Sequence, residues 1–360
     1  MKILVLATDY PNLDGGISLM YIHTRNKLYV KSGIDVTVLN FNTKLSYEID
    51  NVRVISLDEY TSDKEYDILV CHAPNIRNHY KFLRKYGDNF RKIVFFFHGH
   101  EVLKINKVYP KPYSYVKKSS KIKILGQGMY DIFKLYLWKN YIPKLAHKSY
   151  FVFVSNWMYE EFLKYTKINN EIIEGRKYII GNSVDKIFED ESYNLELEKE
   201  YDFITIRSYL DGSKYSIDIV NELAKNNKEC KFLVIGTGEY FNYNKKANNI
   251  TWINRALKHE EIIFYLNKSR CALMPTRTDA QGLMMCEMAT FGINVITSDI
   301  PVCHEICKDF NNIKLIKNEN KDLDLRKILK DLKNNKNKNK KYCRGNTVQK
   351  EIELFEKIIE

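Results

Sequence analysis

Two acidic residues, Asp279 and Glu287, lie in a segment where an apolar, strand-like run gives way to an apolar helix. We expect the strand to end near Pro275 and the helix to run from about Gln281 to Gly292. This glycine can adopt the left-handed backbone conformation that ends a helix. The start of such a helix presents unpaired amides and the positive end of the helix dipole. This pattern predicts a phosphate or diphosphate site at the carboxyl end of a buried strand.

Glu287 is the less easily explained of the two acids, because its helix is otherwise apolar. A carboxylate in such surroundings normally has a specific partner. Since Glu287 and Leu283 share a helix face, the carboxylate is predicted to look back toward a ligand at the helix start, where its two oxygens could accept two vicinal ribose hydroxyls. The alternative is that Asp279 is only a helix cap and Glu287 only a solvated residue.

The elements that must position these residues follow from alternating buried strands and helical segments. A chain of 360 residues is long enough for two domains. Strand, helix, strand repeated predicts parallel sheets covered by helices, and therefore an α/β fold. The expected strands of the first half are 2–8, 35–41, 67–71, 92–97 and 150–154, and those of the second half are 203–207, 231–236, 249–253, 271–275 and 294–298.

An acidic stretch of low apolar content, 186–200, separates the two halves. We therefore predict an amino-terminal domain over 1–185 and a carboxy-terminal domain over 186–344. The last segment, 345–360, has a helical apolar stripe made by Val348, Ile352, Phe355 and Ile359, and it needs a surface to cover.

The spacing Asp279-x7-Glu287, after a strand and Pro275, resembles the E-x7-E element of family 4 glycosyltransferases, the retaining "group 1" enzymes. The resemblance implies a GT-B fold of two Rossmann-like domains facing across a cleft, with the last helix returning to the first domain. In that family the first acid contacts the donor sugar and the second holds the ribose. The backbone that follows the first acid, here Gln281, Gly282 and Leu283, holds sugar and phosphate. Asp279 is shorter than the usual Glu, which leaves the identity of the sugar open.

Further matches follow in the family's order. Gly15-Gly16 resembles its glycine loop, where backbone approaches the diphosphate, although such a pair is also typical of an ordinary turn. His98, at the end of the strand 92–97, resembles the family's histidine on the amino-terminal side of the cleft, with His100 and Glu101 close by. A structural role for this histidine is the alternative.

In the second half, Arg207 and Lys214 resemble the pair of cations that clamps the diphosphate and stabilises its growing charge. Gly236 and Gly238 resemble the family's Gly-x-Gly turn at the donor site, a weak motif by itself. The resemblance implies that His98, Arg207, Lys214 and Asp279 take part in catalysis. The alternative for Lys214 is a solvated side chain.

We therefore expect a retaining, metal-independent glycosyltransferase without a cofactor. It would move a sugar from a UDP- or GDP-sugar to a glycan or lipid-linked acceptor in surface polysaccharide biosynthesis. Two other interpretations are a nucleotide-sugar epimerase on the same fold and a noncatalytic sugar- or nucleotide-binding module.

The formal charge of +12 would attract nucleic acid, anionic lipid or phosphorylated substrates alike. Its distribution is more informative, because 104–148 carries eleven lysines and one acid, Asp131, with interleaved aromatics. This stretch could contact an anionic membrane, bind a single-stranded nucleic acid, or simply be solvated. With the family resemblance, we expect peripheral membrane contact and no nucleic acid. Seven scattered cysteines without a CxxC pair predict reduced thiols and therefore a cytoplasmic protein. Together with the expected membrane contact, this predicts a location at the inner face of the plasma membrane.

Overall fold

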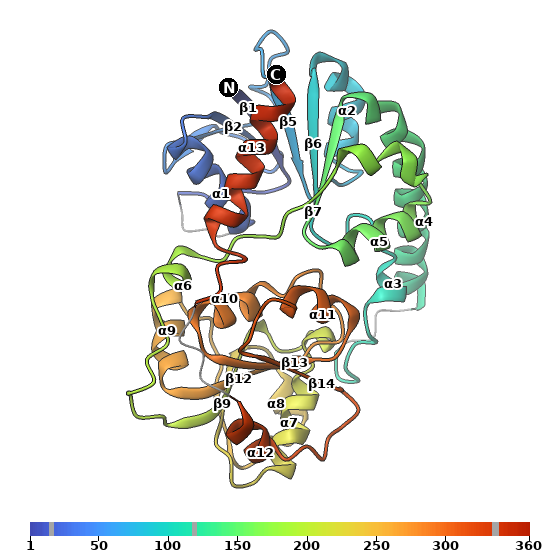
Figure 1. Cartoon of the computed structure of the whole chain (residues 1–360). Coiled ribbons are helices and arrows are strands. Elements are labelled where there is room, and N and C mark those ends of the chain that lie inside the picture. Colours follow the sequence, from blue (N-terminus) through green and yellow to red (C-terminus); the bar gives the residue numbers. More distant parts are fainter. Residues whose placement is uncertain (14–17, 117–120, 333–337) are drawn as a thin grey trace. The chain divides into compact units, whose positions relative to one another are not determined.

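The computed structural model describes residues 1–13, 18–116, 121–332 and 338–360, which form two compact units (Figure 1). Unit 1 comprises Met1–Ile105, Gln127–Ser183 and Arg344–Glu360, and unit 2 comprises Asn106–Gly126 and Val184–Cys343. The division after Ser183 lies close to the boundary predicted at 185. The assignment of Asn106–Gly126 to unit 2 differs from the predicted domains, which placed this segment in the first one.

Unit 1 is built on an eight-stranded sheet of order β3-β4-β2-β1-β5-β6-β7-β8. All neighbours are parallel except β3 and β4, and Val5 of β1 lies in register with Val38 of β2 and Val70 of β5. The central strands are apolar and buried on both faces, as parallel sheets covered by helices require. The strands are β1 Lys2–Ala7, β2 Asp35–Asn40, β3 Tyr47–Ile49, β4 Val52–Ile55, β5 Ile68–His72, β6 Lys92–Phe97, β7 Ser149–Phe153 and β8 Lys177–Ile179.

Unit 2 contains a second, six-stranded parallel sheet of order β11-β10-β9-β12-β13-β14. Its strands are β9 Tyr201–Tyr209, β10 Phe232–Thr237, β11 Ile250–Ile253, β12 Ser269–Met274, β13 Asn294–Ser298 and β14 Ile313–Ile316. The predicted α/β class is confirmed, and each of the ten predicted strands is found. The strands that the sequence pattern missed, β3, β4, β8 and β14, lie at or beside sheet edges, where short strands lack the continuous apolar run of buried ones.

Helices cover both sheets. Unit 1 has α1 Met20–Lys31, α2 His79–Tyr86, most of α4 Lys121–Leu145, α5 Asn156–Thr166 and α13 Val348–Ile359. Unit 2 has α6 Lys186–Asp190, α7 Ile217–Asn226, α8 Tyr240–Tyr243, α9 His259–Asn267, α10 Leu283–Phe291, α11 Pro301–Cys307 and α12 Leu325–Asp331, and α3 Ile105–Val108 begins the segment Asn106–Gly126.

The carboxy-terminal helix α13 belongs to unit 1, as predicted, and lies beside α1 (Figure 1). Val348, Ile352 and Phe355 are buried, and the ring of Phe355 lies 5.3 Å from that of Tyr29 on α1. Ile359, the last member of the predicted stripe, is exposed, and Ile358 is buried in its place.

The segment Asn106–Gly126 is attached to unit 2 through tyrosines. The hydroxyl of Tyr113 donates to Asp218 on α7 (2.7 Å), and that of Tyr115 donates to Asp211 (2.6 Å). Tyr115 also stacks on Tyr243, with ring centroids 4.7 Å apart. A tyrosine can pack its ring against apolar neighbours while its hydroxyl makes a hydrogen bond. These contacts explain why the segment joins unit 2.

Candidate functional site

The loop between β12 and α10 carries the predicted acid. The carboxylate of Asp279 accepts hydrogen bonds from the amides of Ala280 (2.8 Å) and Gln281 (3.4 Å), so it orders the loop and does not cap the helix. Gly282 has a left-handed backbone (φ 73°), and α10 begins at Leu283, slightly later than predicted. No side chain caps this helix start, so the first amides of α10 are available to an anion.

Arg207 lies toward the carboxyl end of the neighbouring strand β9 and is buried. One terminal nitrogen of its guanidinium donates to the carbonyl of Pro275 (2.7 Å), whereas its buried Nε has no hydrogen-bond partner. Burial lowers the pKa of Arg207, although the carboxylate of Asp279 opposes this effect. The group remains a cation at neutral pH. A buried guanidinium with an unsatisfied donor is an unfavourable arrangement that an anionic ligand would relieve.

Lys214 is the second predicted cation, and unit 2 holds it from several sides. Its ammonium lies over the rings of Tyr215 (4.7 Å) and Tyr109 (5.2 Å). Burial lowers the pKa of Lys214, but Tyr215, Tyr109 and Asp279 together outweigh it, so the net shift is upward and the charge is retained. No sequence motif indicated a role for Tyr215, because a cation–π contact of this kind depends on tertiary packing.

The backbone of Lys214 is fixed by residues from the loop after β12. Its carbonyl accepts hydrogen bonds from the amide of Arg277 (2.9 Å) and the hydroxyl of Thr276 (3.0 Å). The guanidinium of Arg277 in turn makes a two-pronged contact with Asp218 (2.8 and 2.5 Å). Arg277 therefore couples the two loops that carry Asp279 and Lys214, a role that sequence inspection did not assign to it.

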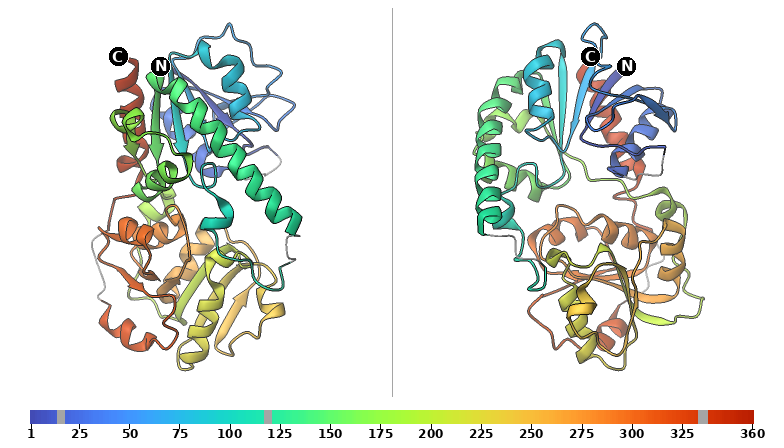
Figure 2. Two further views of the ribbon diagram at one scale, coloured as in Figure 1. Left: turned by 90° about the vertical axis from the view of Figure 1, so that its right-hand side faces the viewer. Right: turned by 180° about the vertical axis from the view of Figure 1, so that it is seen from behind.

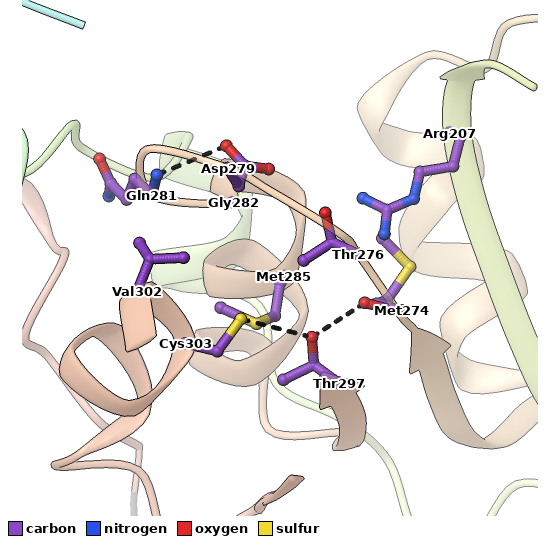
Figure 3. A pocket seen from close by; sticks show the side chains of 10 residues that line it. All are labelled: Arg207, Met274, Thr276, Asp279, Gln281, Gly282, Met285, Thr297, Val302 and Cys303. Atoms are coloured by element: carbon purple, nitrogen blue, oxygen red, sulfur yellow. Dashed lines mark hydrogen bonds between the residues drawn. The ribbon is translucent and has the colours of Figure 1, made fainter. Parts of the chain in front are cut away.

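The loop between β12 and α10 encloses a small pocket together with β9, β13 and α11, and Lys214 does not line it (Figure 3). Arg207 points in from β9, Asp279 and Gln281 come from the loop before α10, and Cys303 comes from α11. The cavity volume of about 10 Å³ is room for one water-sized group, such as a single phosphate oxygen. Its lining residues are Arg207, Met274, Thr276, Asp279, Gln281, Gly282, Met285, Thr297, Val302 and Cys303.

Glu287 is buried and does not line this pocket. Its Oε1 accepts a hydrogen bond from the amide of Asp185 (3.3 Å), and the carboxylate of Asp185 lies 3.5 Å from Nδ1 of His259. Burial raises the pKa of Glu287 to about 7, while His259 and the amide of Asp185 act in the opposite direction. The structure thus separates the two acids of the motif: Asp279 lines the pocket, and Glu287 forms a cluster with Asp185 and His259.

The predicted glycines have a packing role where the structure describes them. A Cβ on Gly236 (φ 151°) would lie 2.1 Å from the carbonyl oxygen of Arg207, and one on Gly238 (φ 141°) would lie 3.0 Å from the carboxylate of Asp211. Gly236 therefore lets β10 approach β9 closely at Arg207. Gly15 and Gly16, the predicted glycine loop, lie outside the described residues.

His98 follows β6 in unit 1, as predicted, with His72 of β5 beside it. Their imidazoles are joined by a hydrogen bond between Nδ1 of His72 and Nε2 of His98 (3.1 Å). Burial lowers the pKa of both rings well below the usual range, so both are neutral at pH 7. The amide of His98 donates to Glu101 (2.5 Å), whereas the side chain of His100 is exposed. Of the two histidines that follow β6, His98 is therefore the one whose side chain is held in place by its neighbours, whereas His100 faces solvent.

Two neighbours of His98 were not identified from the sequence. The ring of Tyr21 on α1 lies 4.8 Å from that of His98, and Arg25, one turn later, donates to Asn182 (2.7 Å). The positive charge of Arg25 contributes to the low pKa of His98, after burial itself. Only the packing of α1 against the strand ends brings these side chains to His98.

Three further findings concern metal binding, the cysteines and membrane spans. Within the described part of the chain, no three histidine, cysteine, aspartate or glutamate side chains converge as a metal site would require. The seven cysteines are buried thiols. No helix among the described residues is both long and apolar enough to span a bilayer.

Comparison with known protein families finds a match to most of the second unit. Residues 186–347 match the family model "Glycosyl transferases group 1". No curated protein sequence matches the chain significantly. The predicted resemblance to group 1 glycosyltransferases is confirmed over the residues that carry Arg207, Lys214, Asp279 and Glu287.

Solved structures share the fold of the whole chain at low identity. Sucrose-phosphate synthase from Thermosynechococcus elongatus has a TM-score of 0.68 at 11% identity, covering 99% of this chain and 98% of that one. A glycosyltransferase from Rickettsia africae ESF-5 has a TM-score of 0.66 at 14% identity, covering 100% and 98%. Anabaena HepE, solved with UDP and glucose, has a TM-score of 0.57 at 12% identity, covering 91% and 89%. The chain therefore has the GT-B fold, as predicted.

Proposed function

We propose that this chain, whose residues 186–347 form a glycosyl transferases group 1 domain, is a retaining glycosyltransferase. It would take a sugar from a UDP- or GDP-sugar and pass it to a glycan or lipid-linked acceptor of a surface polysaccharide, at the cytoplasmic face of the membrane. The main support is Arg207, a buried cation with an unsatisfied Nε beside Asp279 and the uncapped start of α10. These groups suit a diphosphate.

In the proposed reaction, the bond between the anomeric carbon and the diphosphate oxygen breaks while the acceptor hydroxyl forms its bond on the same face of the sugar. The departing diphosphate takes the proton of that hydroxyl. Arg207 and Lys214 stabilise the negative charge that grows on the diphosphate, together with the first amides of α10. This scheme needs neither a metal nor a covalent intermediate.

The remaining predicted residues have supporting roles in this scheme. Asp279 would contact the donor sugar, and Glu287 the ribose hydroxyls. His98 would orient the sugar or acceptor as a neutral hydrogen-bonding group, because its low pKa removes the charge. HepE, solved with UDP and glucose, shares the fold and makes UDP-glucose a reasonable first donor to test.

The decisive experiment has two stages. Thermal shift with a panel of UDP- and GDP-sugars identifies the donor, because a ligand that binds the native state raises the unfolding temperature. NMR of the product then reports the anomeric configuration, and intact mass reports any glycosyl-enzyme. Retention without an adduct supports the proposal, whereas inversion, or an adduct on Asp279 or another acid, contradicts it.

The same experiment separates the two alternative functions. A nucleotide-sugar epimerase would release a modified donor in the absence of any acceptor. A noncatalytic binding module would show donor binding and no turnover at all. Transfer that requires an acceptor excludes both.

A further inference from the structure

The long helix α4 is apolar on two opposite faces. Figure 2 shows it as one continuous helix on the outer side of unit 1. One face packs into the unit: Trp138 is fully buried, with its ring 5.9 Å from Tyr80 and 6.5 Å from Phe95. The opposite face carries large apolar side chains in the open, Met129 (63% exposed), Ile132 (59%), Phe133 (55%) and Tyr136 (62%).

These four residues, which we call the α4 stripe, are spaced as neighbours on one helix face. Singly exposed apolar side chains are common, but a contiguous stripe of four marks an interaction surface. A helix that is apolar all round is normally covered on all sides. The second face of α4 is therefore expected to have a partner of its own.

The charges around the stripe indicate which partner. The only acid of α4, Asp131, is buried and pairs with the buried ammonium of Lys134 (2.9 Å), so this helix exposes no carboxylate. Lys139 and Lys144, beyond the stripe on the same helix, are exposed. Apolar side chains flanked by lysines match a bilayer with anionic headgroups, where apolar burial and charge attraction add.

We propose that the α4 stripe binds the surface of an anionic bilayer, with Met129, Phe133 and Tyr136 entering the headgroup layer and Lys139 and Lys144 contacting anionic lipids. This narrows the membrane surface predicted for 104–148. Tyr113 and Tyr115 are engaged on unit 2, Trp138 is buried, and residues 117–120 lie outside the described part. The inference does not depend on the proposed transfer reaction.

The test is sedimentation of the whole chain with vesicles of phosphatidylglycerol and phosphatidylcholine, and with phosphatidylcholine alone. The triple variant Met129→Ser, Phe133→Ser, Tyr136→Ser is expected to lower the partition coefficient for anionic vesicles at least tenfold. The matched control replaces three scattered exposed apolar residues, Leu45, Leu57 and Phe264, by serine and should bind like the unmodified chain.

A second variant tests the charge. Lys139→Ser with Lys144→Ser should reduce binding to anionic vesicles about thirtyfold at low salt, because each lysine near the surface adds about 1 kcal/mol. The two substitutions should have little effect at high salt, which screens these charges. Binding to phosphatidylcholine alone should be weak for every variant.

Phe133→Trp keeps the test meaningful if the triple variant fails to fold. Its fluorescence should shift to shorter wavelength when anionic vesicles are added, and the same substitution at Phe264 should give no shift. Absence of vesicle binding by the unmodified chain, or equal binding by the folded triple variant, would overturn the proposal. The proposal would also be overturned if light scattering showed the unmodified chain to be a dimer and the triple variant to be a monomer. The α4 stripe would then be covered by a second copy of the chain.

Discussion

The buried guanidinium of Arg25 on α1 lies 3.0 Å from the carboxylate of Glu351 on α13, and it donates to that oxygen through Nε. The hydroxyl of Tyr29 donates to the other oxygen of Glu351. Both charged side chains are almost completely buried. This ion pair ties the last helix of the chain to the first helix of unit 1, next to the residues that surround His98.

Glu351→Ala is therefore expected to destabilise unit 1 by about 3–5 kcal/mol, because it leaves a buried guanidinium without its counter-charge. Denaturant unfolding followed by circular dichroism measures the change. Asp88→Ala, which removes a solvent-exposed partner of Lys148 in the same unit, should leave the midpoint nearly unchanged. If the two substitutions changed the free energy of unfolding equally, the buried ion pair would contribute no more to stability than the exposed one.

Replacement of Arg207 tests the proposed diphosphate clamp. Arg207→Ala should lower kcat by roughly two or more orders of magnitude, as for the loss of a preorganised donor to a developing charge. Arg255→Ala is the control in the same unit, since Arg255 is exposed and pairs with Glu261. Steady-state kinetics over a range of donor concentrations gives kcat and KM separately, and a change in KM alone would assign Arg207 to binding only.

The predicted ribose contact of Glu287 is tested by Glu287→Gln. The amide keeps the shape of the side chain but removes a charge-assisted acceptor, so the affinity for the nucleotide-sugar should fall while the fold stays intact. Calorimetric titration with the donor measures this, and Glu260→Gln on the neighbouring helix α9 serves as the control. Unchanged affinity would restrict Glu287 to its structural contact with Asp185.

The pKa of about 7 for Glu287 also predicts a pH dependence of stability. Because the folded-state pKa is raised above the unfolded value, the stability from this group is fully present below about pH 4.5 and is lost as pH rises to about 7. The unmodified chain should therefore lose roughly 3 kcal/mol relative to Glu287→Gln across this range. Unfolding of both proteins at several pH values checks this. His259→Gln separates the contribution of the neighbouring imidazole, and a constant difference would contradict the prediction.

Removal of metal ions tests the proposed chemistry in another way. Since Arg207, Lys214 and the amides of α10 are proposed to neutralise the diphosphate, transfer should survive an excess of EDTA. Initial rates with and without the chelator decide the matter. Loss of activity that Mg²⁺ or Mn²⁺ restores on titration would mean that these side chains are insufficient.

Much of the fold was predictable because its signals are local. Apolar runs separated by helical segments indicate buried parallel strands at ten places, and Gly292 ends α10 through its own backbone freedom. The same local signals place Arg207 and Asp279 at the carboxyl ends of two strands, and the structure shows that these strands, β9 and β12, are adjacent. Their convergence in one pocket follows from that topology.

Partners that are distant in sequence were decided by the tertiary structure alone. Glu287 contacts Asp185, Arg25 pairs with Glu351, and Tyr109 and Tyr113 reach unit 2 from the first half of the chain. A composition of lysines and aromatics could not tell the buried Trp138 from the exposed Phe133, since both lie on one helix. Periodicity is set by neighbouring residues, whereas burial and hydrogen-bond partners depend on which surfaces meet when the whole chain packs.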